Sequence, residues 1–265
     1  MLNITALGPA HAAAIAVLPG VALYGDVFAP VAQHLPDTRS LLVDLPGHGA
    51  SRDIPWRSIT DTAQAALDAL PDTVTGIAAV SLGAYVGLTM LALAPNRFQH
   101  ALLSGIHHGD MPNPRLMRVV SWAMAPFISR PFLARRNATA MGVAPGIIDS
   151  YVAGAVQTRP RAFARATCDV VDFTLPRGLD QVSTRVLIAA GSKEHSLILE
   201  GQATICAALP NAQACRATGL GHGWPAQDIG LFAALLRAHA LGAQWPDGIA
   251  QVPSGPISQT TLDAP

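Results

Sequence analysis

The chain has 265 residues, of which 50% are hydrophobic and 13% are charged, and its formal net charge at pH 7 is zero. This length is enough for one large domain or two small ones, and the high apolar content excludes a mainly disordered chain. Because 17 basic side chains are balanced by 17 acidic ones, we expect no nucleic-acid partner.

The cysteines Cys168, Cys206 and Cys215 are odd in number and lack the spacing of a metal site. Buried free thiols in a reducing compartment explain them most simply, so we expect a cytoplasmic protein. The apolar run near the N-terminus has no basic segment before it and stops at Pro19, which argues against a secretory signal. No apolar stretch is long enough to span a bilayer. For the assembly we expect a monomer or a homodimer.

Short apolar runs alternate with segments of helical spacing along most of the chain. In the first part we predict strands at 13–18, 40–45, 74–80 and 100–105, and helices at 25–35, 58–70 and 83–94. Near the C-terminus we predict strands at 184–191 and 212–218, and helices near 196–208 and 225–240. This alternation is typical of right-handed βαβ units. The sequence therefore predicts an α/β fold, a mostly parallel sheet with helices on both faces.

The stretch 108–182 interrupts the alternation with helical sequence and no convincing strand. It leaves from the carboxyl end of a strand, where open α/β sheets bind ligands. We therefore expect an inserted helical cap at 108–182 between two parts of a core, 1–107 and 183–242. Extra helices packed on a sheet face are the alternative. The segment 243–265 is rich in Pro, Gly, Ser, Thr and Gln, which predicts a flexible C-terminal tail.

A serine follows the predicted strand 74–80 directly. Ala79, Ser81 and Gly83 give the pattern Ala-x-Ser-x-Gly, which differs by one letter from the Gly-x-Ser-x-Gly of a nucleophile elbow. Small residues are needed there because strand and helix meet at a sharp turn, and Ala79 adds only one methyl group. Ser81 is therefore a candidate nucleophile, and an N-cap serine is the alternative.

Two later loops carry candidate partners for this serine. His222 lies between two glycines after the last predicted strand, where little bulk surrounds the ring of a general base. Glu194 follows the strand 184–191, on a turn from which a carboxylate can bind the second imidazole N–H. Asp110 is the alternative acid. His195 is expected to be a neighbour in the loop rather than a second base.

The segment 18–25, LPGVALYG, has a strand that leads into a glycine-containing turn and then a helix. Such a loop can direct a backbone N–H at a developing oxyanion. The N–H groups of Val21 and Leu82 are the candidate donors of an oxyanion hole. A plain strand-to-helix turn is the alternative.

The order Ser, acid, His resembles that of the α/β-hydrolase superfamily, over roughly residues 10–242. The turn VDLPGHGAS at 43–51 resembles the signature D-x-P-G-H-G-x-S that many members carry before the elbow. By this resemblance His48 is structural and hydrogen-bonds its own loop. Because the N-terminal segment is short, the first antiparallel strands of the family are expected to be trimmed or absent.

The resemblance implies acyl transfer. Ser81 would attack a carbonyl with His222 as general base, and the N–H groups of Val21 and Leu82 would hold the oxyanion. Water would then clear the acyl-enzyme. No metal or organic cofactor is expected.

The cap sequence suggests the character of a substrate pocket. Met117, Trp122, Met124 and Phe127 are candidates for an apolar wall, although for each of them a place in the core of the cap is the alternative. His107 lies where the cap begins and could contact substrate or orient the acid, and a plain polar loop position is the alternative. The arginines of the cap are expected to form a solvated basic face rather than an anion site.

Together these features predict a serine hydrolase that cleaves a small, largely apolar carboxylic ester, lactone or thioester. The same fold also supports C–C hydrolysis, amide cleavage, perhydrolysis and lyase reactions. A non-enzymatic small-molecule receptor on this scaffold is a further alternative. Such a receptor would often have lost a member of the triad, whereas here each position has a candidate.

Overall fold

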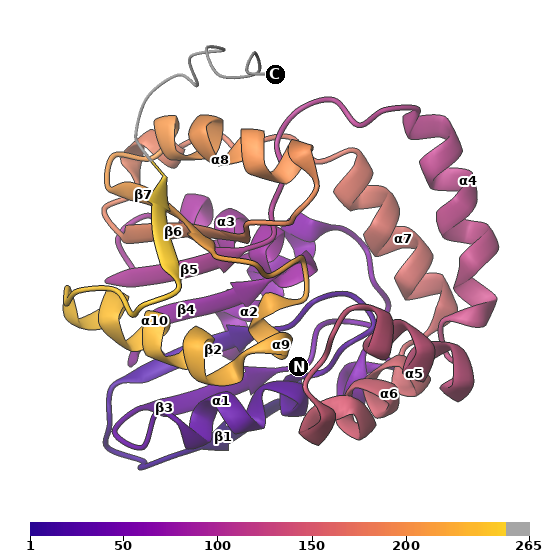
Figure 1. Ribbon diagram of the computed structural model, residues 1–265, viewed down its shortest axis with the longest axis horizontal. Helices are drawn as coiled ribbons and strands as arrows, with labels where there is room; N and C mark the ends of the chain where they lie inside the picture. Colours follow the sequence, from indigo (N-terminus) through magenta and orange to yellow (C-terminus); the bar gives the residue numbers. More distant parts are fainter. Residues whose placement is uncertain (253–265) are drawn as a thin grey trace, which may run out of the picture.

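The computed structural model describes residues 1–252, in which eight strands form one sheet (Figure 1). The strands are β1 (Ile4–Leu7), β2 (Ala14–Leu18), β3 (Arg39–Val43), β4 (Val74–Val80), β5 (His100–Ser104), β6 (Arg185–Gly191), β7 (Ala212–Ala217) and β8 (Ile249–Val252). Their order across the sheet is β1-β3-β2-β4-β5-β6-β7-β8. The six central strands are parallel, and only β1 and β8 at the two edges of this sheet pair antiparallel.

The predicted mostly parallel sheet with helices on both faces is confirmed. One face packs against α2 (Ile59–Ala69), α3 (Leu82–Leu93) and α8 (Ser196–Ala207). The other packs against η1 (Gly25–Phe28), α1 (Ala29–Gln33), α9 (Trp224–Gln227) and α10 (Ile229–Leu241). Because both faces are covered, the central strands are continuous apolar runs, and all five residues of β2 are buried.

Between β5 and β6 the described chain contains helices and no strand. These are α4 (Pro114–Met124), η3 (Ala125–Phe127), α5 (Pro131–Ala140), η4 (Pro145–Ile147), α6 (Ile148–Gln157), α7 (Pro160–Val171) and η5 (Leu179–Gln181). Helices α4, α5 and α7 each begin with proline, whose fixed φ suits the first helical turn. Figure 1 shows α4 to α7 grouped at one end of the sheet, with α4 against α7 and α5 against α6.

The two edge strands differ from expectation. Strand β1 is present and pairs with β3, although the first antiparallel strands were expected to be trimmed or absent. Strand β8 lies inside the expected tail 243–265 and pairs with β7. Each has only four residues and no fully buried position, so neither carries the apolar run that marks the inner strands. The rest of the expected tail, 253–265, lies outside the described residues.

Among the described helices, none has both the length and the apolar character needed to cross a membrane.

The turn after β3 is organised by a buried carboxylate. Asp44 accepts hydrogen bonds from the N–H groups of Gly25 and Ala50, both at 2.8 Å, and from the Asn3 amide at 3.0 Å. His48 in the same turn is fully buried, and its Nδ1 lies 2.9 Å from the carbonyl oxygen of Pro46. Nδ1 therefore carries the proton, since a carbonyl can only accept. Nε2 has no partner among the described residues, and burial lowers the pKa of His48 to about 4.

His48 should make folding sensitive to mild acid. Its pKa is about 4 when folded and 6.5 when unfolded, so between these values the unfolded chain binds more protons and stability falls as pH falls. We expect His48 to account for a loss of about 2 kcal/mol in unfolding free energy between pH 7 and pH 5. Urea unfolding of wild type and His48→Gln at both pH values measures this. The variant should be less stable at pH 7 and should show a smaller pH dependence. An equal pH dependence in the two proteins would contradict the assignment.

Candidate active site

Ser81 occupies a sharp turn between β4 and α3. Its backbone has φ 52° and ψ −121°, a conformation that non-glycine residues rarely adopt. Its N–H donates a hydrogen bond to the carbonyl oxygen of Ser104 at 2.7 Å, which fixes the end of β4 against β5. A Cβ on Gly83 would lie 2.2 Å from the carbonyl oxygen of Leu18, so only glycine permits the first turn of α3 to approach β2 this closely.

Ala79 fits into this turn because the residue opposite its methyl group is small. Ala79 is fully buried, and a Cβ on Gly87 of α3 would lie 3.3 Å from the Ala79 methyl carbon. A glycine at position 87 therefore leaves room for the methyl group that departs from the Gly-x-Ser-x-Gly pattern.

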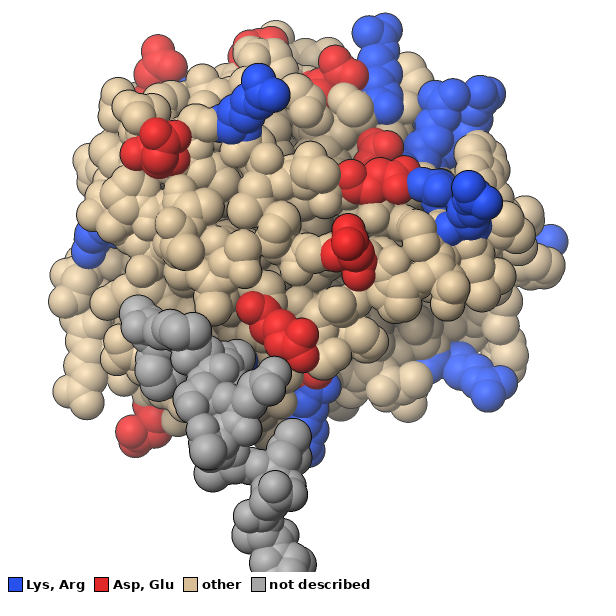
Figure 2. Space-filling model, turned by 90° about the horizontal axis from the view of Figure 1, so that it is seen from above, with Lys and Arg blue, Asp and Glu red and all other residues tan. Residues whose placement is uncertain are grey.

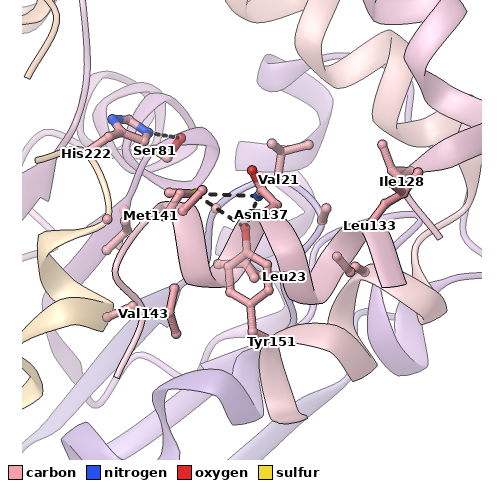
Figure 3. A pocket seen from close by; sticks show the side chains of 18 of the residues that line it. Val21, Leu23, Ser81, Ile128, Leu133, Asn137, Met141, Val143, Tyr151 and His222 are labelled. Carbon is pink, nitrogen blue, oxygen red and sulfur yellow. Dashed lines mark hydrogen bonds between the residues drawn. The ribbon is translucent and has the colours of Figure 1, made fainter. Parts of the chain in front are cut away.

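The structure brings Ser81, His222 and Glu194 together. The Nε2 of His222 lies 3.1 Å from the Ser81 hydroxyl, as Figure 3 shows, and its Nδ1 lies 2.5 Å from the Glu194 carboxylate. A carboxylate accepts the Nδ1 proton, which leaves an Nε2 lone pair facing the serine, as a general base requires. The Glu194 side chain is fully buried, whereas that of His222 is 41% exposed.

The loops that carry Glu194 and His222 are tied to each other and to the sheet. The N–H of Lys193 donates to the carbonyl oxygen of Leu220 at 2.9 Å. The Trp224 indole N–H donates to the Ser104 hydroxyl at 2.8 Å. The Gly191 N–H donates to the Glu194 carboxylate at 3.3 Å. These contacts hold the acid and the imidazole at the carboxyl ends of β6 and β7.

The alternative acid does not take part in this arrangement. Asp110 is exposed, and the Nδ1 of His222 is already bound to Glu194. His195 caps α8, where its Nδ1 accepts a hydrogen bond from the Leu197 N–H at 3.3 Å. It is therefore a loop neighbour of Glu194, as the sequence suggested.

The two candidate oxyanion donors come from two places near Ser81, Leu82 directly after it in the chain and Val21 in the loop after β2. Leu82 is the first residue of α3, where helix geometry leaves the N–H without an intrahelical partner. Val21 lines the same cavity as Ser81, and a Cβ on Gly20 would lie 3.3 Å from the Ser81 Cβ. Within residues 1–252, the hydrogen bonds of turns, loops and side chains include none donated by the Val21 or Leu82 N–H.

A cavity of about 570 Å³ opens beside Ser81 and His222. Its wall is largely apolar and comes from the loop after β2, from η3, and from α5 and α6 (Figure 3). A polar patch lies in this wall, where the Asn137 amide donates to the Tyr151 hydroxyl at 2.7 Å. Arg136 is the one Arg or Lys among the described residues that line the cavity.

The predicted pocket residues fall into two groups. Met124 and Phe127 line the cavity. Met117 and Trp122, on α4, do not line it, and 40% and 50% of their surfaces are exposed. His107 is buried away from the cavity, with its Nδ1 bound to the Tyr85 hydroxyl, and burial lowers its pKa. The structure therefore gives no support to substrate contacts by Met117, Trp122 or His107.

The helices α5 and α6 lie inside the expected cap 108–182, but none of their residues that line the cavity was predicted. Leu133, Asn137 and Met141 are spaced four residues apart along α5 and its end, and Tyr151 comes from α6. The spacing indicates a shared helix face. It does not indicate which side of the helix meets the cavity, because that depends on how α5 packs against α6.

The described residues contain no group of three or more His, Cys, Asp or Glu side chains that could hold a metal ion.

A model of the alpha/beta hydrolase family matches residues 15–235. The chain belongs to this family. A curated relative, the pimeloyl-[acyl-carrier protein] methyl ester esterase of Xanthomonas oryzae, is 28% identical over 80% of this chain and 88% of its own.

Solved structures show the same fold. A hydrolase from Pseudomonas aeruginosa has a TM-score of 0.75 at 18% identity, covering 91% of this chain and 94% of its own. An esterase from Exiguobacterium antarcticum has a TM-score of 0.75 at 15% identity, covering 91% of this chain and 95% of its own. These likenesses establish the architecture of this alpha/beta hydrolase.

The two candidate acids can be separated by matched amide substitutions. We expect Glu194→Gln to lower kcat for a model substrate such as 4-nitrophenyl butyrate by about a hundredfold or more, because His222 loses the carboxylate that fixes its tautomer. Asp110→Asn should change kcat by less than about twofold, because Asp110 is exposed and away from the imidazole. Steady-state kinetics of both variants provides the comparison. The opposite ranking would exclude Glu194 as the acid.

Proposed function

We propose that this protein is a serine hydrolase that cleaves carboxylic esters through an acyl-enzyme on Ser81. The observation that carries the proposal is the hydrogen-bonded chain from Ser81 through His222 to the buried Glu194, at the wall of an apolar cavity. Membership of the alpha/beta hydrolase family and the ester-hydrolysing relatives support the same chemistry.

In the first half of the reaction, His222 takes the proton from the Ser81 hydroxyl as the oxygen attacks the ester carbonyl. Glu194 stabilises the imidazolium that forms. The N–H groups of Val21 and Leu82 hold the negative charge on the former carbonyl oxygen, which is the largest single contribution in reactions of this kind. His222 then gives the proton to the departing alcohol, and the acyl group remains on Ser81.

In the second half, water enters and His222 removes its proton. The resulting hydroxide equivalent attacks the acyl-enzyme, the same N–H groups hold the oxyanion, and Ser81 leaves with the proton from His222. No step requires a group beyond these side chains, the two N–H groups and water. The 41% exposure of the His222 side chain is compatible with water reaching it.

The cavity points to the substrate class. We propose that α4 to α7 act as a cap over the site, with α5 and α6 forming an apolar wall around the acyl part of the ester. The curated relatives are named for a methyl ester on an acyl chain bound to a carrier protein. They support an ester with a small alcohol and a largely apolar acyl chain as the substrate. Lactones and thioesters offer the same carbonyl to Ser81.

The three free cysteines support a cytoplasmic location for this chemistry, because a reducing compartment keeps thiols unpaired.

The other reactions of the fold, including C–C hydrolysis and amide cleavage, use the same triad and differ in the bond that is cleaved. A panel of substrates therefore separates them, and a receptor without turnover would hydrolyse none of them.

The acyl-chain preference should follow the apolar wall. For 4-nitrophenyl acetate, butyrate and octanoate we expect kcat/KM to rise at least about tenfold from acetate to octanoate, since each buried CH₂ contributes about 0.8 kcal/mol. Leu133→Asp places a charge on this wall and should lower kcat/KM for octanoate about tenfold more than for acetate. Ser81→Ala should abolish turnover of all three.

The control is Leu241→Asp, an exposed leucine at the end of α10 that does not line the cavity. It should leave the profile unchanged. A flat profile that Leu133→Asp does not alter would argue against acyl binding in this cavity. No hydrolysis of any ester by the folded wild type would refute the proposed function.

A further inference from the structure

Helix α4 turns its apolar side toward solvent. Its most exposed large side chains are Leu116 at 59% and Val119 at 64%, and no residue of the helix is buried. The least exposed positions are the polar Arg118 and Ser121, and Arg118 forms an ion pair of 2.5 Å with Asp172 beyond α7. An amphipathic helix on a globular protein normally shows the reverse arrangement, with its apolar side inward.

The apolar surface continues past the end of α4. Met124 and Phe127 are each 49% exposed, and Phe132 at the start of α5 is 74% exposed. We call the exposed set of Leu116, Val119, Val120, Met124, Phe127 and Phe132 the apolar cap face. Met124 and Phe127 also line the cavity, so the face adjoins the entrance to the candidate active site. Exposed apolar side chains gathered beside a pocket are a feature of binding surfaces.

The same segment is strongly basic. Residues 111–148 contain five arginines and no aspartate or glutamate. Arg118 and Arg135 pair with Asp172 and Asp149. No acidic side chain of residues 1–252 lies within 4.0 Å of the remaining three, which are Arg115, Arg130 and Arg136. In Figure 2, the Lys and Arg side chains gather at the right-hand end of the molecule, which is the end that α4 and α7 occupy in Figure 1.

We propose that the apolar cap face docks on an anionic lipid surface and places the entrance of the cavity at that surface. A lipid surface offers both components that this segment needs, since headgroups carry the negative charge and acyl chains accept the apolar side chains. Trp122, half exposed on the same helix, is of the residue type that favours the boundary between headgroups and hydrocarbon.

Two other occupants fit less well. A second copy of this chain in a two-fold dimer would bring Arg115 and Arg130 toward a face that has no acidic residue to match them. A soluble acidic protein would match the arginines, but it would also have to present apolar side chains of its own to Leu116, Val119 and Phe132, which are 59%, 64% and 74% exposed. The lipid surface satisfies both the charge and the apolar area.

The docking goes beyond the proposed hydrolysis and does not depend on it. An amphiphilic acyl compound in the lipid would reach the cavity along Met124 and Phe127 without crossing water. Because binding requires no turnover, the Ser81→Ala variant should bind lipid as the wild type does. Loss of hydrolysis and loss of docking are therefore separately measurable.

Co-sedimentation with vesicles tests the proposal. We expect the full-length protein to bind vesicles of phosphatidylcholine and phosphatidylglycerol, and to bind vesicles of phosphatidylcholine alone at least about tenfold more weakly. The double variant Leu116→Glu/Val119→Glu should lower the partition coefficient at least about tenfold. Arg115→Gln and Arg130→Gln should each lower it about fivefold. Leu241→Glu, an exposed leucine on α10, is the matched control and should bind as the wild type does.

Hydrolysis of soluble 4-nitrophenyl butyrate should be unchanged in all of these variants, which shows that they fold, since none of the substituted residues lines the cavity. Failure of the wild type to bind either vesicle, or binding that Leu116→Glu/Val119→Glu does not weaken, would overturn the proposal. A wild-type dimer that this variant dissociates would assign the face to a second copy. Saturable binding of an acidic acyl carrier protein in place of vesicles would assign it to that protein.

Discussion

The candidate site depends on the backbone of Ser81, which is held at positive φ between β4 and α3. A non-glycine residue in such a conformation costs on the order of 1–3 kcal/mol, so the surrounding structure must hold it in place. The hydrogen bond from the Ser81 N–H to Ser104 holds one side, and the close approach of Gly83 to β2 holds the other. Both constraints come from the central parallel strands, so the packed sheet stabilises the position of the hydroxyl.

A second consequence of the sheet is the meeting of Glu194 and His222. They follow β6 and β7, two neighbouring parallel strands. The carboxyl ends of both strands lie at the same end of the sheet as the carboxyl end of β4. The Glu194 carboxylate is removed from water, so it needs hydrogen-bond partners. The Gly191 N–H and the His222 ring supply them, which orients the imidazole toward Ser81.

The central strands and the three residues Ser81, Glu194 and His222 could be predicted because each rests on local sequence. Buried parallel strands are continuous apolar runs, and β4 was predicted with its observed bounds, 74–80. Strands β1 and β8 were missed because four half-exposed residues at a sheet edge leave no such run. Of the pocket residues predicted on α4, Met124 lines the cavity but Met117 and Trp122 do not. The rule that apolar side chains face inward fails along most of this helix, where Arg118 pairs with Asp172 and the apolar side chains are exposed. The orientation of a helix is set by its neighbours, and the sequence of α4 alone does not reveal them.

The proposed hydrolysis requires that Ser81 is an activated nucleophile. Mass spectrometry after treatment with a fluorophosphonate tests it most directly, with Ser81→Ala and Glu194→Gln treated in parallel. We expect one covalent adduct per chain, located on the peptide that contains Ser81. It should be absent from Ser81→Ala and form much more slowly in Glu194→Gln. A folded wild type that forms no adduct, or an adduct on another residue, would contradict it.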